Sequence, residues 1–290
     1  MGTKKDSLVC PCGSGKKFSA CCERYFSVLG LNSPRQGSRT ILFEWLGIYS
    51  QPIVMSFTEK ARSYIFRISC YLDWIMDQFF PIESDKVSSE KETISKAVFS
   101  MKNNILHSLL ASFSCLSQGL FIQSGILIRS LVEECLVLLD LSENRNQVER
   151  FLQGKYSTNG LVSRVKSSVP PTIISWYGYF SANFAHFGPL HPAPYLPTAC
   201  YADNYVLVVG LQNIVRAIVT FHVVLERMYF SKIRLPLFWK RIEGKADLLF
   251  EEDSSVFTWA EELGKEIISH YPPNERKEGF IYDSQDYRPK

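Results

Sequence analysis

Four of the eight cysteines in this 290-residue chain fall within thirteen residues near the N-terminus. They form two pairs, Cys10 with Cys12 and Cys21 with Cys22, separated by eight residues. In the reducing cytoplasm, four soft sulfur ligands at such short range favour a tetrahedral zinc ion over disulfides. Glycines between the pairs allow the backbone to turn sharply over the ion. Because four thiolates fill the tetrahedron, the predicted zinc has no open position for catalysis.

The stretch from Cys10 to Cys22 resembles the SEC-C motif, the zinc knuckle found at the C-terminus of the SecA translocation ATPase and in many otherwise unrelated bacterial proteins. The resemblance implies a bound zinc ion and, as in SecA, a surface that docks a protein partner. Lys16 and Lys17 are placed to offset the negative charge that four thiolates leave on a dication. In the alternative interpretation, zinc only holds together a peptide too short to bury a core.

A second group of charges lies inside an apolar stretch between Phe121 and Leu141. Arg129 and Glu133 are four residues apart, which places them on one face of a helix, with Glu134 beside them. Charges in apolar surroundings are expected to be paired. One interpretation is an ion pair that fixes the helix register, and the other is a functional pocket with that pair as its floor.

The segments Gln118–Glu133 and Tyr179–His186 resemble a bacterial helical family of undefined function that is often joined to SEC-C knuckles. They are also similar to the HEPN helical bundles of toxins and phage-defence proteins. This resemblance covers residues 90–230 and implies an all-α bundle. It also implies a role in a toxin–antitoxin or phage-defence system and, for the ribonuclease members, metal-independent RNA cleavage.

For such cleavage His186 would take the 2′-hydroxyl proton and Arg129 would stabilise the phosphorane. HEPN ribonucleases carry their Arg and His within one short segment, whereas here the two residues must meet in space, within one copy or across a dimer. Because His186 precedes Gly188 and Pro189, its alternative roles are to cap the last carbonyls of a helix or to bind a ligand. The other histidines considered are interpreted as structural: His107, His191 and His222.

Composition narrows the class of protein further. Hydrophobic residues at 46% and charged residues at 21% are typical of a soluble globular protein. The net charge of +3, carried by the first 24 residues, is too small to argue for nucleic-acid binding by itself. The start lacks the apolar stretch of a secretory signal, so we expect a cytoplasmic protein. The two most apolar regions, Ile105–Ile128 and Tyr205–Leu225, contain polar residues that lipid disfavours, and we interpret them as buried helices.

The elements that must position these residues are helical, because apolar residues recur at intervals of three and four. The predicted helices are 56–79, 89–117, 121–141, 144–153, 158–169, 172–186, 201–230 and 255–269. Gly119 is expected to mark a bend or a close contact, and the proline-rich segment 186–197 a stiff extended arm.

We therefore expect an all-α helical bundle with a small N-terminal zinc knuckle. The predicted parts are a zinc knuckle (1–28), a linker (29–39), a HEPN-like helical domain (40–230) and a C-terminal helical extension and tail (231–290). The favoured function is a binding or adaptor protein that docks a protein partner through the knuckle. The alternative is a ribonuclease that uses Arg129 and His186 on RNA. We expect no membrane partner, and the sequence leaves self-association open.

Overall fold

The computed structural model describes residues 16–20, 23, 50–84, 89–184, 204–243, 247–251 and 254–270. Within these ranges the protein is mostly helical, which agrees with the all-α prediction. The predicted linker at 29–39 and the predicted arm at 186–197 lie outside the described residues.

The bundle is built from eight α-helices in the described part of the chain. They are α3 (Ser50–Phe79), α4 (Ser89–Ser117), α5 (Phe121–Glu143), α6 (Arg145–Leu152), α7 (Leu161–Val165), α8 (Pro171–Phe184), α9 (Asn204–Tyr229) and α10 (Ser255–His270). The short 3-10 helices are η2 (Phe18–Ala20) and η4 (Pro81–Ser84), and the strands are β1 (Trp239–Arg241) and β2 (Leu248–Phe250).

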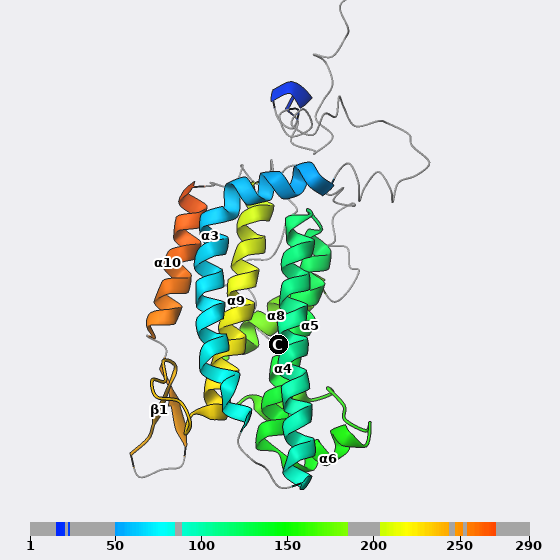
Figure 1. The fold of residues 1–290 in the computed structure, drawn as a ribbon, viewed down its shortest axis with the longest axis vertical. Helices are drawn as coiled ribbons and strands as arrows, with labels where there is room; N and C mark the ends of the chain where they lie inside the picture. Colours follow the sequence, from blue (N-terminus) through cyan, green and yellow to red (C-terminus); the bar gives the residue numbers. More distant parts are fainter. Residues whose placement is uncertain are drawn as a thin grey trace, which may run out of the picture.

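Two helices differ most from the sequence prediction. Helix α3 begins at Ser50 rather than at residue 56, and in Figure 1 its first part crosses the end of the bundle before the helix turns down along it. The helix expected over 158–169 is confined to Leu161–Val165. The residue before it, Gly160, has a φ of 72°. This left-handed conformation does not continue a right-handed helix, so α7 starts after it.

Helices α4 and α5 form an antiparallel hairpin that turns at Gly119, where the sequence predicts a bend or a close contact. The φ of Gly119 is 78°, and its amide donates to the carbonyl of Leu116 at 2.9 Å. A glycine adopts this conformation without the steric cost that a Cβ would bring. The turn brings α5 back against α4 along the length of the bundle.

Helix α9 is the centre of the bundle and packs against α3, α4, α5 and α10 (Figure 1). Its stretch Leu207–Tyr229 is, among the described helices, the one long and apolar enough to cross a membrane. Neighbouring elements bury 83% of its most apolar window, as expected of a helix inside a core. Side chains such as Ile214, Ile218 and Phe221 are almost completely buried, and each contributes about 1.5 to 3 kcal/mol by leaving water.

A buried carboxylate, Asp140, fixes the connection between α6 and α7. Asp140 is fully buried at the end of α5 and accepts hydrogen bonds from the Tyr156 hydroxyl and from Arg164 Nε, both at 2.8 Å. Arg164 also donates to the backbone carbonyls of Ser157 and Asn159. Because buried charges must be paired, this network holds the connection in one conformation.

The two-stranded antiparallel sheet was not predicted from the sequence. Trp239 pairs with Phe250 and Arg241 with Leu248. Strands of three residues are too short to show an alternating pattern. The sheet is instead attached to the bundle by α9, because Glu226 Oε1 accepts the backbone amides of Phe238 (2.7 Å) and Trp239 (2.9 Å).

Helix α10 returns to the first helix of the bundle and lies beside α3 in Figure 1. Two polar contacts join them: the Tyr64 hydroxyl lies 2.5 Å from His270 Nδ1, and Arg67 forms an ion pair with Glu266. Leu263 is fully buried on the inner side of α10. The region after residue 230 therefore contributes to the bundle core as well as to the sheet.

Candidate functional site

The predicted zinc ligands all lie outside the described residues: Cys10, Cys12, Cys21 and Cys22. Between the two pairs, Phe18–Ala20 form the turn η2, in which the amide of Ala20 donates to the carbonyl of Lys17 at 3.0 Å. Lys16 and Lys17 are exposed. The donor set of four thiols in two close pairs fits Zn²⁺, which prefers sulfur ligands in a tetrahedron.

No other metal site competes with the cysteine pairs in the described part of the chain. There, no three histidine, cysteine or carboxylate side chains gather closely enough to hold an ion. The described cysteines are separate residues, with Cys70 exposed, Cys115 half-buried and Cys135 buried.

Arg129 and Glu133 form the ion pair that their spacing predicts. Arg129 Nη1 lies 2.6 Å from Glu133 Oε2, and the two side chains are 27% and 18% exposed. Helix α5 turns Ile128, Leu131 and Val132 into the core. The helix is thus a core element, as expected, but the ion pair lies at the edge of the core and within reach of solvent.

Helix α8, which packs on α5, adds a tyrosine to this pair. Arg129 Nη2 lies 3.4 Å from the Tyr177 hydroxyl, which in turn lies 3.5 Å from Glu133 Oε1. The guanidinium carbon is 5.8 Å from the centre of the Tyr177 ring, close enough for a cation–π attraction. The three side chains form one group, which we call the Arg129 cluster.

Polar atoms next to the Arg129 cluster lack partners among the described residues. Arg129 Nε and Glu134 Oε2 are both buried without a hydrogen bond. Burial, together with the charge of Glu133, raises the pKa of Glu134. Since buried polar atoms are nearly always paired, leaving these two atoms without hydrogen bonds costs free energy of folding.

His186, the second residue of the ribonuclease hypothesis, lies outside the described residues. Helix α8 ends two residues earlier at Phe184, whose ring makes an edge-to-face contact with Phe121 at 5.7 Å. The Phe184 ring also lies so close to Gly125 that a Cβ there would be 2.2 Å away. The structure therefore positions Arg129, paired with Glu133, and does not position the histidine relative to it.

A second polar group inside the bundle was not predicted as a unit. The Tyr71 hydroxyl of α3 lies 2.5 Å from His222 Nδ1, and His222 Nε2 lies 3.4 Å from Glu226 Oε2. His222 and Glu226 are fully buried. Burial lowers the pKa of His222, although the nearby Glu226 acts in the opposite direction. Burial, and secondarily the charge of Glu226, raises the pKa of Tyr71, so the hydroxyl keeps its proton and can donate to Nδ1.

The sequence contained only part of the signal for this Tyr71–His222–Glu226 array. His222 and Glu226 are one helical turn apart, and His222 was interpreted as structural. Its full burial beside the rings of Trp74, Phe79 and Phe238 agrees with that interpretation. Tyr71 is 151 residues away in the chain, so no local spacing links it to the pair.

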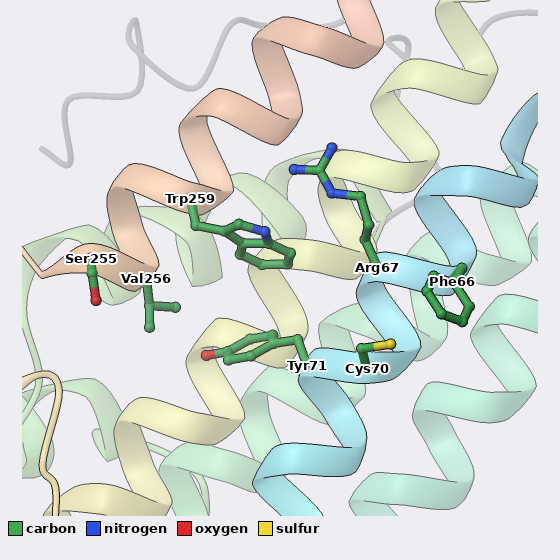
Figure 2. Close-up of a pocket in the computed structure, with 7 residues that line it drawn as sticks. All are labelled: Phe66, Arg67, Cys70, Tyr71, Ser255, Val256 and Trp259. Carbon is green, nitrogen blue, oxygen red and sulfur yellow. The ribbon is translucent and has the colours of Figure 1, made fainter.

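A cavity of about 430 Å³ opens between α3 and α10, and Figure 2 shows the residues that line it. The rings of Tyr71 and Trp259 contact each other between the two helices, with centres 5.0 Å apart and planes tilted by 52°. Arg67 and Cys70 come from α3. The ring of Tyr71 lines this cavity, and the hydroxyl of the same residue contacts His222.

One short segment of the chain matches a known family. Residues 9–24 match the SEC-C motif, which confirms the resemblance noted from the sequence, and this motif is commonly metal-binding. No curated protein and no solved structure matches the chain. The match covers all four predicted zinc ligands and none of the helical bundle, whose resemblance to HEPN domains stays a prediction.

Proposed function

We propose that this chain is a zinc-dependent adaptor protein that docks a protein partner through its SEC-C segment. The observation that carries the proposal is the SEC-C match over residues 9–24, which contains two cysteine pairs. Zinc held by Cys10, Cys12, Cys21 and Cys22 would stabilise a segment too short to bury a core of its own. The helical bundle would then be the scaffold that carries this docking segment.

The biological setting is a finer part of the same proposal. The resemblance of residues 90–230 to HEPN bundles supports a place in a bacterial toxin–antitoxin or phage-defence system, in the cytoplasm. This support comes from a resemblance and not from a binding site in the structure. The partner is therefore described only as a protein that recognises the zinc-bound segment.

The experiment compares two double variants with the wild-type protein. Cys21→Ser/Cys22→Ser removes two predicted ligands, and Cys70→Ser/Cys115→Ser removes two thiols outside the motif as a matched control. We expect one equivalent of zinc in the wild-type and control proteins and none in the motif variant. A partner captured from the native host by the first two proteins and lost by the third supports the proposal. Zinc or partner retained by the motif variant contradicts it.

The second candidate function is a metal-independent ribonuclease that uses Arg129 and His186. The observation in its favour is that the Arg129 cluster is partly exposed, so a phosphate could reach the guanidinium from solvent. The ion pair with Glu133 weighs against it, because the carboxylate already compensates the charge of the guanidinium and holds its Nη1. The adaptor is therefore the function that the observations favour.

A further inference from the structure

The cavity between α3 and α10 has the size of a small-molecule site. Its volume of about 430 Å³ falls in the range that such sites occupy in proteins, about 300 to 1,000 Å³. Two helices from opposite ends of the described chain line it, as Figure 2 shows. We call it the α3–α10 cavity.

The aromatic wall of this cavity is fixed before any ligand arrives. The ring of Tyr71 is held by the contact of its hydroxyl with His222 Nδ1 and by the parallel ring of Trp74, whose centre is 6.4 Å away. The ring of Trp259 completes the wall from α10. Rings that are already fixed lose little conformational freedom when a flat apolar molecule packs on them.

Apolar surface in this lining is still open to water. Phe66 lines the cavity from α3, and its side chain is 69% exposed. Other large apolar residues of the same helix are at most 2% exposed: Phe57, Ile68 and Phe79. Covering the exposed ring of Phe66 with an apolar ligand removes this surface from water, which is favourable.

The charges of the lining favour an uncharged ligand. Arg67 is the charged side chain of the lining, and it forms an ion pair with Glu266 of α10. Tyr71 keeps its proton, because burial raises its pKa. An ionic ligand would lose hydration here without gaining a counter-ion that the protein does not already use.

One polar group of the lining calls for a hydrogen-bond acceptor. No described residue accepts a hydrogen bond from Trp259 Nε1, and in Figure 2 the indole extends from α10 toward α3. An indole N–H can only donate. A ligand that displaces water from Trp259 must therefore bring an acceptor, because an N–H left unpaired costs free energy. A carbonyl oxygen on an aromatic ring system meets this need without adding charge.

We propose that the α3–α10 cavity binds a small uncharged aromatic molecule that carries a carbonyl group. Its ring system packs on Tyr71, and its carbonyl oxygen accepts a hydrogen bond from Trp259 Nε1. The site shares no residue with the SEC-C segment and goes beyond the adaptor function.

The test uses three fluorescent naphthalenes that share a dimethylamino group. Prodan carries a ketone and no charge, 2-dimethylaminonaphthalene lacks the ketone, and 6-dimethylamino-2-naphthoate replaces it with a carboxylate. The first comparison tests the hydrogen bond to Trp259, and the second tests the preference for an uncharged ligand.

Three variants accompany the wild-type protein. Trp259→Phe removes the N–H and keeps an aromatic ring. Cys70→Trp fills the cavity from an exposed position of α3 that lies between Phe66 and Tyr71 in Figure 2. The matched control, Leu110→Trp, adds the same ring at a position of α4 that is 54% exposed and lies outside the lining. Thermal unfolding checks that each variant is folded.

We expect the wild-type protein to bind prodan saturably at one site. Trp259→Phe should weaken prodan about fivefold, as for the net contribution of one hydrogen bond, and leave 2-dimethylaminonaphthalene unchanged. The naphthoate should bind about tenfold more weakly than prodan, because its charge must be desolvated. Cys70→Trp should abolish prodan binding, and Leu110→Trp should not change it.

Four results would overturn the proposal. They are a wild-type protein that does not bind prodan saturably, prodan binding that survives Cys70→Trp, equal losses in Cys70→Trp and Leu110→Trp, and a naphthoate that binds as tightly as prodan. An unchanged prodan affinity in Trp259→Phe would also contradict it, because the proposed hydrogen bond would then be absent.

Discussion

The hydroxyl of Tyr71 lies 2.5 Å from Nδ1 of His222 and joins helices that begin more than 150 residues apart. The rings of Trp74, Phe79 and Phe238 pack against the imidazole. A neutral imidazole fits this environment, because burial disfavours the charged form more than the Glu226 carboxylate, 3.4 Å from Nε2, favours it.

The protein is therefore expected to lose stability in mild acid. Because the pKa of His222 is lowered in the folded protein, the unfolded chain takes up a proton at this residue at a higher pH than the folded chain does. Stability from this group is fully present above the ordinary histidine pKa of about 6.5 and falls as the pH drops below it, by at most about 1.4 kcal/mol per pH unit. Urea unfolding from pH 7.5 to 5 measures it. His222→Phe should flatten the slope, whereas the exposed His107→Gln serves as the control and should not.

Replacing Arg129 by methionine should destabilise the protein by about 1 to 3 kcal/mol. This range lies between the values for fully buried and exposed ion pairs, because both side chains are partly exposed. Arg129→Met/Glu133→Leu should recover much of the loss. Lys265→Met breaks a pair of the same spacing that is 78% and 74% exposed, and should cost less than about 0.5 kcal/mol. Equal losses in Arg129→Met and Lys265→Met would contradict the partly buried position of Arg129.

Asp140→Ala should be among the most costly single substitutions in the bundle. It leaves Arg164 and Tyr156 without their common carboxylate, and breaking such a buried pair costs about 3 to 5 kcal/mol. A second readout is the ionisation of Tyr156, whose pKa burial and the hydrogen bond to Asp140 raise to about 12. In a variant that still folds, ultraviolet titration should show this pKa lowered. A variant as stable as the wild type would show that the network does not hold the α6–α7 connection.

Removing zinc should leave the helices of the bundle intact. None of the four predicted ligands lies in a described helix, and the proposed metal site stabilises only its own short segment. Far-ultraviolet circular dichroism before and after a strong chelator measures the helical content. A large loss of helicity would show that the metal segment and the bundle fold as one unit.

His186→Ala separates the two candidate functions. For a ribonuclease, loss of a general base should lower cleavage by about 100- to 10,000-fold and leave stability unchanged. For an adaptor, purified wild-type protein should show no RNA cleavage, and partner capture should survive the substitution. We expect the second result. Cleavage that persists in chelator, ends in a 2′,3′-cyclic phosphate and disappears in His186→Ala would favour the ribonuclease.

Local sequence signals predicted the helices well, because apolar residues recur at intervals of three and four within each helix. The interval from Ser89 to Ser117 is predicted and observed alike, and Gly119 turns the chain where expected. The β1–β2 sheet was missed because three-residue strands carry no period. Glu226, which binds the amides of Phe238 and Trp239, fixes the start of this sheet, and that contact exists only after α9 is packed.

The candidate sites also divide into those that local spacing predicts and those that form only when the helices pack. Spacing alone predicted the Arg129–Glu133 pair, since both residues lie on one helix. Tyr177 joins the cluster from α8, 48 residues away from Arg129, and Tyr71 meets His222 only in the folded bundle. Contacts between helices depend on how the helices cross, and no pattern within a single segment contains that information.

The return of α10 to α3 has a consequence for synthesis on the ribosome. The contacts Tyr64–His270 and Arg67–Glu266 join positions 206 and 199 residues apart. At translation rates of about 5 to 20 residues per second, α10 is synthesised roughly 10 to 40 s after α3. During that interval the α3 surface that receives α10, including the ring of Tyr71, is open in the nascent chain. A chaperone that binds nascent chains therefore has a defined time window and a defined apolar surface on this protein.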